Sequence, residues 1–131
     1  MTGRIESTFQ RLGQANKKAL IAYLMAGDPT LADTERLVVE IEQAGADIIE
    51  LGVPFSDPIA DGPVIQLAAE RALRSGTSLR KILAMMKSLR TRTQVPIVLM
   101  VYYNSIHAMG LETFCREAGM AGIDGLIVPD M

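Results

Sequence analysis

Residues 48–63 read IIELGVPFSDPIADGP, and this stretch decides the fold class and the chemistry that we expect of the chain. Its first six residues are apolar or glycine apart from Glu50, which indicates a short buried strand. A proline-rich loop follows, and Asp61 stands where Pro63 predicts that a helix begins. We therefore expect two carboxylates, joined by a stiffened loop, to act as an acid/base pair over one small substrate.

Each of these carboxylates also has an interpretation that involves no chemistry. Glutamate disfavours strands and is rarely buried unless it is paired, so Glu50 either faces a pocket or forms an ion pair with a lysine or arginine at the strand end. The sequence Asp61-Gly62-Pro63 is typical of a helix N-cap, and capping alone explains Asp61. The two interpretations of Asp61 are compatible, because a capping residue can also face a pocket.

Four apolar runs predict strands, and apolar residues at helical spacing predict helices around them. The strands are expected at residues 19–26, 47–53, 97–103 and 125–128, and the helices at residues 5–12, 31–44, 62–74, 79–86 and 111–118. Continuous apolar runs are typical of parallel strands covered on both faces, and strands that alternate with helices predict an α/β fold. The length fits one domain, residues 1–131.

A short pattern occurs twice, at two predicted junctions between a helix and the next strand. The residues Ala-Gly-x-Asp, followed by an apolar run, stand at positions 44–47 and again at positions 121–124. Each copy indicates a helix end, a tight turn and a strand start. The repetition is consistent with a barrel made of repeated βα units, although any βα protein can reuse this turn.

Composition argues against several classes of function. The net charge of −2 provides no field that would attract nucleic acid or an anionic membrane, and no apolar run reaches the ~18 residues of a membrane span. Cys115 is the single cysteine, which excludes an internal disulfide and makes a reducing cytoplasm the expected location. We place Cys115 on the buried stripe of the helix at 111–118. Motifs for metal ions, nucleotides and hydrolytic serines are absent, so no metal site is expected.

Aromatic residues are a further set of candidates. Tyr23, Tyr102 and Tyr103 fall on predicted strands, and the period of two along a strand turns either Tyr102 or Tyr103 inward. These side chains either fill the core or line a pocket for an aromatic substrate. His107 is the single histidine and is predicted to lie in a surface loop.

The opening stretch and three other segments together resemble one enzyme family, the tryptophan synthase alpha chain. They read ELGVPFSDP with ADGP (residues 50–58 and 60–63), MAGDP (25–29), MVYYN (100–104) and GLIVPD (125–130). The resemblance covers the entire chain, but only the N-terminal half of such a protein. It implies a (β/α)8 TIM barrel, of which this chain would form the first four βα units, a half-barrel with parallel strands.

The resemblance also implies an activity, a lyase reaction of tryptophan biosynthesis that uses no cofactor. Indole-3-glycerol phosphate is cleaved by a retro-aldol step to indole and glyceraldehyde 3-phosphate. Glu50 would be the general acid/base, which protonates indole C3 and takes the proton of the glycerol hydroxyl. Asp61 would bind the indole N–H and stabilise the positive charge that develops on the ring.

Other residues would bind the substrate or a partner protein. The resemblance assigns substrate binding to Tyr23, Met100, Tyr102, Ile127 and Pro129. It assigns contact with the tryptophan synthase beta chain to Pro54, Phe55 and Asp57. In the family the two chains form an alpha2beta2 heterotetramer, in which indole passes to the beta chain through a tunnel.

The end of the chain soon after the fourth predicted strand leads to two further expectations. That strand would expose an edge and an apolar face, and the substrate phosphate would lack its binding loops, which in such barrels follow the seventh and eighth strands. The 131 residues alone would then have little or no lyase activity. The alternatives are a non-catalytic half-barrel module, which associates with itself or with its missing half, and another barrel enzyme that acts on a sugar phosphate. The PFSDP-x-ADGP loop argues against the latter.

Overall fold

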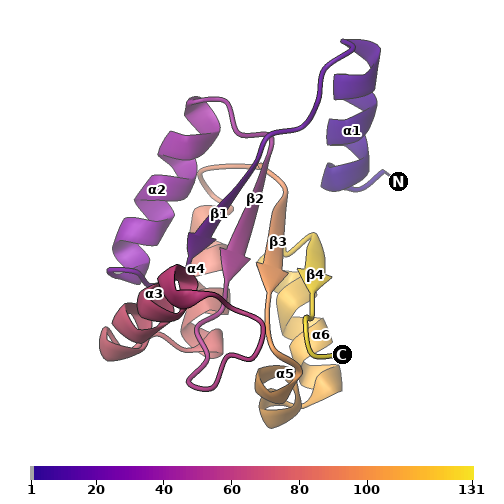
Figure 1. Ribbon diagram of the computed structural model, residues 1–131. Helices are drawn as coiled ribbons and strands as arrows, with labels where there is room; N and C mark the ends of the chain where they lie inside the picture. Colours follow the sequence, from indigo (N-terminus) through magenta and orange to yellow (C-terminus); the bar gives the residue numbers. More distant parts are fainter. Residues whose placement is uncertain (1) are drawn as a thin grey trace.

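Four parallel strands form a single sheet in the computed structural model, which describes residues 2–131 (Figure 1). The strands are β1 (Ile21–Met25), β2 (Ile48–Gly52), β3 (Ile97–Met100) and β4 (Gly125–Ile127), and they lie side by side in chain order. Every neighbouring pair is parallel. The predicted α/β fold and its four strands are confirmed, and each strand is shorter than the apolar run that predicted it.

Six helices connect or flank these strands within the described residues. They are α1 (Arg4–Gln14), α2 (Leu31–Gln43), α3 (Pro63–Arg74), α4 (Leu79–Leu89), α5 (Tyr103–Met109) and α6 (Leu111–Ala121). Thr30 and Ser78 cap α2 and α4, because the side-chain oxygen of each accepts the backbone N–H of the residue three positions on. All of these helices except α5 correspond to predicted ones.

The short helix α5 takes the place of the end of the predicted third strand. We expected a strand through residue 103, but β3 ends at Met100 and Tyr103 begins α5. Tyr102 lies where the chain leaves the sheet, and it is buried there. The apolar run in the sequence therefore continues past the end of the strand. The predictions that Tyr102 and Tyr103 lie on a strand and that His107 lies in a loop are therefore wrong. Tyr102 is the N-cap of α5, and the other two residues belong to that helix.

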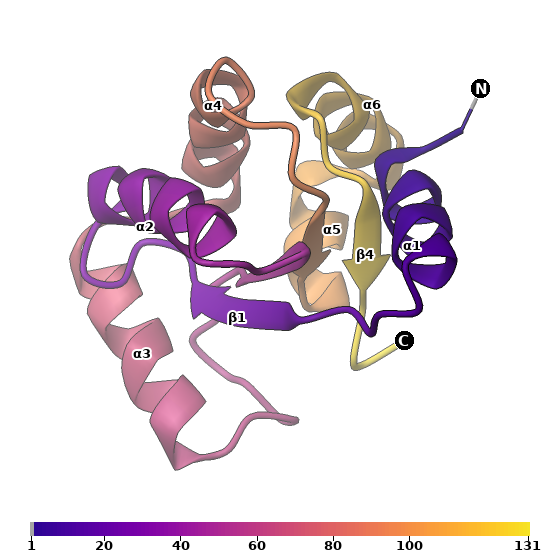
Figure 2. The same ribbon diagram turned by 90° about the horizontal axis from the view of Figure 1, so that it is seen from above.

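The side of the sheet that faces α2, α4 and α6 forms the main core (Figure 2). Ile49, Leu51, Ile97 and Leu99 belong to this core and are fully buried. Burying a side chain of this size stabilises a fold by about 1.5–3 kcal/mol. The helices on this side are therefore held to the sheet mainly by apolar packing.

Cys115 does not belong to this core. We expected it on the buried stripe of its helix, but it is exposed on α6. Phe114 and Ala118 take the inward positions of that helix instead. The helix turns about 100° per residue, so the neighbour of an inward residue can face solvent even within an apolar stretch.

The opposite side of the sheet, which we call the open face, carries the alternate residues of each strand. The register aligns one row of residues across the sheet, Tyr23, Glu50, Val98 and Gly125, and a second row, Met25, Gly52, Met100 and Ile127. Helix α3 covers this face beside β1, on the side away from α2 and α4 (Figure 2). At the start of β4 the face meets α1, because Ile5 Cδ1 lies 3.3 Å from the place of a Cβ atom at Gly125. Toward the end of β4, Ile127 is 44% exposed, which confirms the expected apolar exposure.

The repeated Ala-Gly-x-Asp pattern fixes the register at the N-terminal ends of the strands. Asp47 accepts the N–H of Leu20 through its carboxylate (2.8 Å) and donates its own N–H to the Leu20 carbonyl (2.9 Å). Asp124 makes the same two contacts with Ile97, at 2.8 and 2.9 Å. Each aspartate therefore joins the start of its own strand to the start of the strand before it in the sheet.

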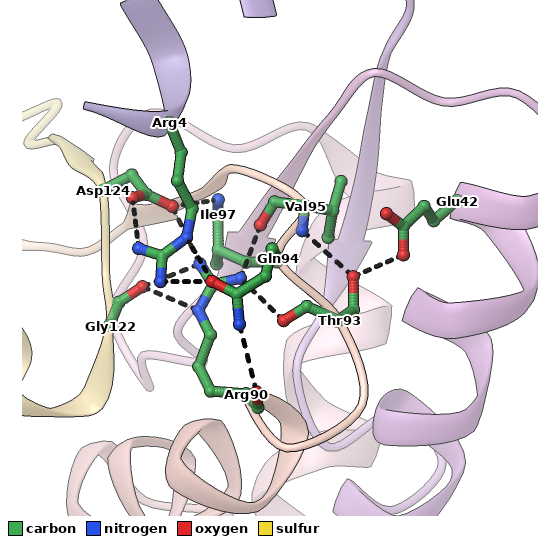
Figure 3. A network of polar contacts seen from close by, with 9 residues as sticks. All are labelled: Arg4, Glu42, Arg90, Thr93, Gln94, Val95, Ile97, Gly122 and Asp124. Atoms are coloured by element: carbon green, nitrogen blue, oxygen red, sulfur yellow. Dashed lines mark hydrogen bonds and ion pairs between the residues drawn. The ribbon is translucent and has the colours of Figure 1, made fainter. Parts of the chain in front are cut away.

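Asp124 is also the centre of a buried ionic network at the N-terminal edge of the sheet (Figure 3). One of its oxygens lies 2.8 Å from Arg90 Nη2, and the two side chains are only 10% (Arg90) and 9% (Asp124) exposed. Arg90 also donates to three backbone carbonyl oxygens, including that of Gly122. Arg4 of α1 donates to the second oxygen of Asp124 (3.0 Å). The network thus joins α1 to the connections that precede β3 and β4.

Replacing Asp124 by alanine is expected to lower the free energy of unfolding by about 3–5 kcal/mol, because Arg90 would stay buried without its counter-charge. Urea denaturation followed by circular dichroism measures the change. The matched control is Glu70→Ala, which removes an exposed ion pair with Arg74 (3.5 Å) and should cost less than about 0.5 kcal/mol. Equal losses in the two variants would contradict the structural role of the Arg90–Asp124 pair.

Candidate active site

Glu50 lies in the middle of β2 on the open face, between Tyr23 of β1 and Val98 of β3. Its side chain is partly buried, and burial raises the pKa of its carboxyl group above the ordinary value. None of the ion pairs among residues 2–131 includes Glu50. The alternative interpretation, a strand-end glutamate paired with a lysine or arginine, therefore finds no support in the contacts.

Asp61 lies one residue before the cap of α3 and not at the cap itself. Gly62 is the N-cap, and no side chain caps this helix. Pro63 is the first helical residue and favours an extended residue before it, so the boundary falls at Gly62. The expectation that Asp61 caps the helix is therefore wrong. Its backbone carbonyl accepts a hydrogen bond from the Gln66 side chain (2.7 Å), while its carboxylate takes no part in capping.

The charges of Glu50 and Asp61 both affect the phenol group of Tyr23. Burial is the largest cause of the raised pKa of Tyr23, and the charges of Asp61 and then Glu50 raise that pKa further. The hydroxyl oxygen of Tyr23 is buried and has no hydrogen-bond partner among the described residues. Glu50 of β2 and Asp61 of the loop before α3 are thus both near the Tyr23 hydroxyl, which extends over Gly52 toward the C-terminal edge of the sheet, where βα barrels place their active sites.

Gly52 provides the space that the Tyr23 ring occupies. A Cβ atom at position 52 would fall 2.8 Å from Tyr23 Cζ, closer still to its hydroxyl oxygen, and 3.2 Å from Met25 Cε. The ring therefore leans over the backbone of β2, one row beyond Glu50. Sequence reasoning missed this role, because a glycine in a strand does not reveal which neighbouring side chain fills its place.

Helix α3 also packs against the ring of Tyr23. Tyr23 packs against a small cluster formed by Met25 and by alanines of α3. Arg71 anchors this helix, because two of its N–H groups donate to the two carboxylate oxygens of Asp28, each at 2.9 Å. Asp28 follows β1, so the pair ties α3 to the turn at the end of that strand. Arg71 is a positioning residue that the sequence analysis did not identify.

Tyr102 holds the loop between β2 and α3 against the end of the sheet. The side chain is 1% exposed, and its hydroxyl oxygen accepts a hydrogen bond from the N–H of Ala60 (3.0 Å). Its ring stacks on Phe55 with the ring centroids 5.2 Å apart. These contacts fix both halves of the loop that carries Asp61. The next residue, Tyr103, donates its backbone N–H to Asp130 beyond β4 (2.8 Å).

The other residues expected to bind substrate lie along the same side of the sheet. Met100 and Ile127 are neighbours on the open face, in the row of Gly52. Pro129 is exposed after the end of β4. The fold therefore puts all three near the C-terminal ends of the strands, and their contact with a substrate stays a prediction.

The residues expected to contact a partner chain differ in exposure. Pro54 is buried, and Phe55 is partly buried beneath its stacking contact with Tyr102. Asp57 is exposed, and Ser56 donates a hydrogen bond to its carboxylate (2.9 Å). Of the three, Asp57 is thus the one most accessible to another protein.

Hollows at three places among residues 2–131 are lined by neither Glu50 nor Asp61. Two of them, of about 190 and 310 Å³, lie beside α4 and share Arg80 and Met109 as lining residues. Residues 2–131 contain no group of three or more His, Cys, Asp and Glu side chains that could hold a metal ion. Across the same part of the chain, no helix is both long and apolar enough to pass through a membrane.

Comparison with known proteins finds closely similar sequences. The family model described as "Tryptophan synthase alpha chain" matches residues 9–131. The tryptophan synthase alpha chain of Geotalea daltonii is 57% identical over 129 residues, which cover 98% of this chain and 49% of that relative. The alpha chain of Alkaliphilus metalliredigens is 52% identical over 131 residues, which cover 100% of this chain and 49% of that relative.

Solved structures agree with the sequence comparisons. Tryptophan synthase subunit alpha from Legionella pneumophila strain Paris has a TM-score of 0.96 at 41% identity, over 99% of this chain and 50% of that chain. The aminoacrylate-bound form of tryptophan synthase from M. tuberculosis has a TM-score of 0.91 at 37% identity, over 99% of this chain and 53% of that chain. The chain thus spans about half the length of the relatives that it matches.

Replacing Glu50 by glutamine is expected to stabilise the chain at neutral pH. Burial raises the pKa of Glu50 in the folded state, so the folded chain binds its proton more tightly than the unfolded chain. The free energy of unfolding of the unmodified chain therefore falls as the pH rises above the ordinary carboxyl pKa of 4.5. The glutamine variant lacks this loss, so its advantage should be absent near pH 4 and grow toward pH 7, in urea titrations at both values.

The matched control is Glu70→Gln on α3, which changes an exposed glutamate and should give no pH-dependent advantage. A gain from Glu50→Gln that is as large at pH 4 as at pH 7 would show that the buried charge is not its cause.

Replacing Tyr102 by phenylalanine is expected to loosen the loop before α3 without unfolding the chain. The variant keeps the stacking on Phe55 and removes only the acceptor of the Ala60 N–H. Hydrogen exchange at the Ala60 amide, measured by NMR, should become about 3- to 10-fold faster, as expected for the loss of one hydrogen bond. Tyr103→Phe is the control. Identical exchange rates in the unmodified chain and in both variants would show that the Tyr102 hydroxyl does not stabilise the loop.

Proposed function

The chain belongs to the tryptophan synthase alpha chain family, and we propose that it carries the acid/base groups of a lyase that cleaves indole-3-glycerol phosphate to indole and glyceraldehyde 3-phosphate. The TIM-barrel fold class predicted from the sequence is confirmed, since the four parallel strands and their helices superpose on an alpha subunit of about twice the length. Because the chain spans about half of its relatives, we propose the activity for the protein completed by the other half.

The observation that carries this proposal is the convergence of two carboxylates with different surroundings. Glu50 is partly buried on the open face, and its raised pKa lets it hold a proton at a higher pH than an ordinary carboxyl group does. Asp61 comes from the loop before α3, and its carboxylate takes no part in capping that helix. Two acids in different environments suit two different roles in one reaction.

Glu50 would act on both fragments of the substrate. As the acid, it delivers a proton to C3 of the indole ring, after which the bond between C3 and the side chain breaks and its electron pair returns to the ring. As the base, its carboxylate takes the proton of the hydroxyl group on the departing carbon, which becomes the aldehyde of glyceraldehyde 3-phosphate. The proton that Glu50 gives is thus returned, and neither water nor a cofactor enters the balance.

Asp61 would stabilise the intermediate stage of this reaction. Protonation at C3 places positive charge on the ring nitrogen, and a carboxylate that accepts the N–H hydrogen bond favours that charge. Tyr23, Met100, Tyr102, Ile127 and Pro129 would surround the substrate. The position of Met100 and Ile127 on the open face supports this assignment.

We also propose contact with a tryptophan synthase beta chain through Pro54, Phe55 and Asp57, in the cytoplasm. The exposure of Asp57 and the attachment of the loop to Tyr102 support this surface. A partner that binds the loop would act on the segment that carries Asp61.

A second candidate function is that of a half-barrel module that pairs with a second copy or with its missing half. Ile21 and Ile127 lie on the open face and are 51% and 44% exposed. Apolar surface of this kind favours coverage by another polypeptide. Light scattering over a range of concentrations tests it: a concentration-dependent dimer supports the module, and a monomer at all concentrations argues against self-association.

A fusion of this chain with the remaining half of the Geotalea daltonii relative tests the lyase reaction. The fusion is expected to release indole from indole-3-glycerol phosphate. Glu50→Gln should lower kcat by at least about 100-fold, because general acid/base catalysis is lost. Asp61→Asn should lower kcat by about 100-fold, because charge stabilisation is lost.

Glu70→Gln on α3 is the matched control and should leave kcat unchanged. A folded fusion that releases no indole would contradict the proposed reaction. An active fusion that tolerates Glu50→Gln would refute the role of Glu50 and leave the reaction itself in place.

A further inference from the structure

We infer that the hydroxyl group of Tyr23 is a specificity-determining hydrogen-bond donor, which binds a neutral oxygen atom on the side chain of the substrate. The inference rests on the proposed function, because it adds one contact to the same site. It starts from a buried polar atom that no described residue satisfies.

The ring that carries this hydroxyl is held in place from two sides. The register puts Tyr23 directly opposite Glu50, and the ring leans over Gly52, where any larger residue would collide with it. On the other side, the ring packs against Met25 and the alanines of α3, and Arg71 fixes that helix to Asp28. A hydroxyl group on so restricted a ring cannot turn far to find a partner.

The hydroxyl oxygen is nonetheless unpaired. It is buried and makes no hydrogen bond with any group in residues 2–131. A buried hydroxyl without a partner destabilises the folded chain, and a ligand that supplies a partner recovers that free energy. The atom therefore marks a position where the site gains from the arrival of a polar ligand atom.

The neighbouring carboxylates favour the protonated phenol, so the hydroxyl has a hydrogen atom to donate. Burial and the carboxylates of Asp61 and Glu50 raise the pKa of Tyr23, and Tyr102 adds to the effect. The phenol therefore keeps its proton at neutral pH and offers it to an acceptor. Because Asp61 and Glu50 are acids, the same surroundings disfavour an anionic oxygen next to the phenol.

These conditions select one part of the proposed substrate. The indole ring offers only an N–H group, which the proposed function already pairs with the carboxylate of Asp61. The phosphate oxygens accept hydrogen bonds but carry negative charge, which the two carboxylates repel. The hydroxyl oxygens of the glycerol side chain are neutral acceptors, so they fit the Tyr23 hydroxyl.

An NMR titration of the ¹⁵N-labelled chain with two probes tests this assignment. The probes are indole-3-glycerol phosphate and indole-3-propanol phosphate, which has the same ring and phosphate but lacks the two hydroxyl groups of the side chain. Tyr23→Phe is expected to weaken binding of the glycerol compound by about 3- to 10-fold, the effect of one neutral hydrogen bond. Binding of the propanol compound should stay unchanged, and Tyr103→Phe should alter neither.

Two results would overturn the inference while leaving the proposed function in place. One is a Tyr23→Phe variant that binds both probes as the unmodified chain does, or that loses affinity for both equally. The other is a displaced NMR titration midpoint of the Glu50 carboxyl group in that variant, which would show that the hydroxyl serves Glu50 and not the ligand. An unmodified chain that binds neither probe would also overturn the inference, while the proposed function, which belongs to the protein completed by the other half, would still be tested by the fusion.

Discussion

The register between β1 and β2 is the constraint on which the rest of the structure depends. Side chains alternate between the two faces of a sheet, so a slip of one residue would turn Glu50 toward the helices and Leu51 toward the open face. Burial of an unpaired carboxylate in the apolar core would be strongly unfavourable. Asp47 secures the correct register through its two hydrogen bonds with Leu20. A residue at one end of the sheet thus decides which side chains meet near the other end.

The two ends of the sheet carry polar groups in different states. At the N-terminal end, Arg90 and Asp124 bind each other and several backbone groups, so their buried charges are compensated. Toward the C-terminal end, within residues 2–131, the Tyr23 hydroxyl has no hydrogen-bond partner and the Glu50 carboxylate belongs to no ion pair. Compensated groups stabilise the fold, whereas uncompensated ones lower its stability and leave hydrogen-bonding capacity for a ligand. The contrast separates the part of the molecule that maintains the fold from the part that we propose to bind a substrate.

The strands, most helices and the position of Glu50 within a strand could be predicted from the sequence, because each depends on a local pattern of apolar and polar residues. The cap of α3 was misplaced by one residue, since Pro63 moves the boundary to Gly62 and a pattern of residue types does not resolve such a shift. The contact between Tyr23 and Gly52 joins two strands and depends on how a ring leans, which no spacing along the chain encodes. Helix α5 was not predicted, because the buried residues between β3 and α5 continue the apolar run past the end of the strand.

The order of the strands has a consequence for how the chain is made. Each strand pairs with the one synthesised immediately before it, so the sheet has a single growing edge as the polypeptide leaves the ribosome. No strand must wait for a distant segment, and contacts between near neighbours in sequence form faster than remote ones. The aspartates at positions 47 and 124 precede β2 and β4, so each is already synthesised when its strand docks. Assembly can therefore keep pace with translation, one βα unit at a time.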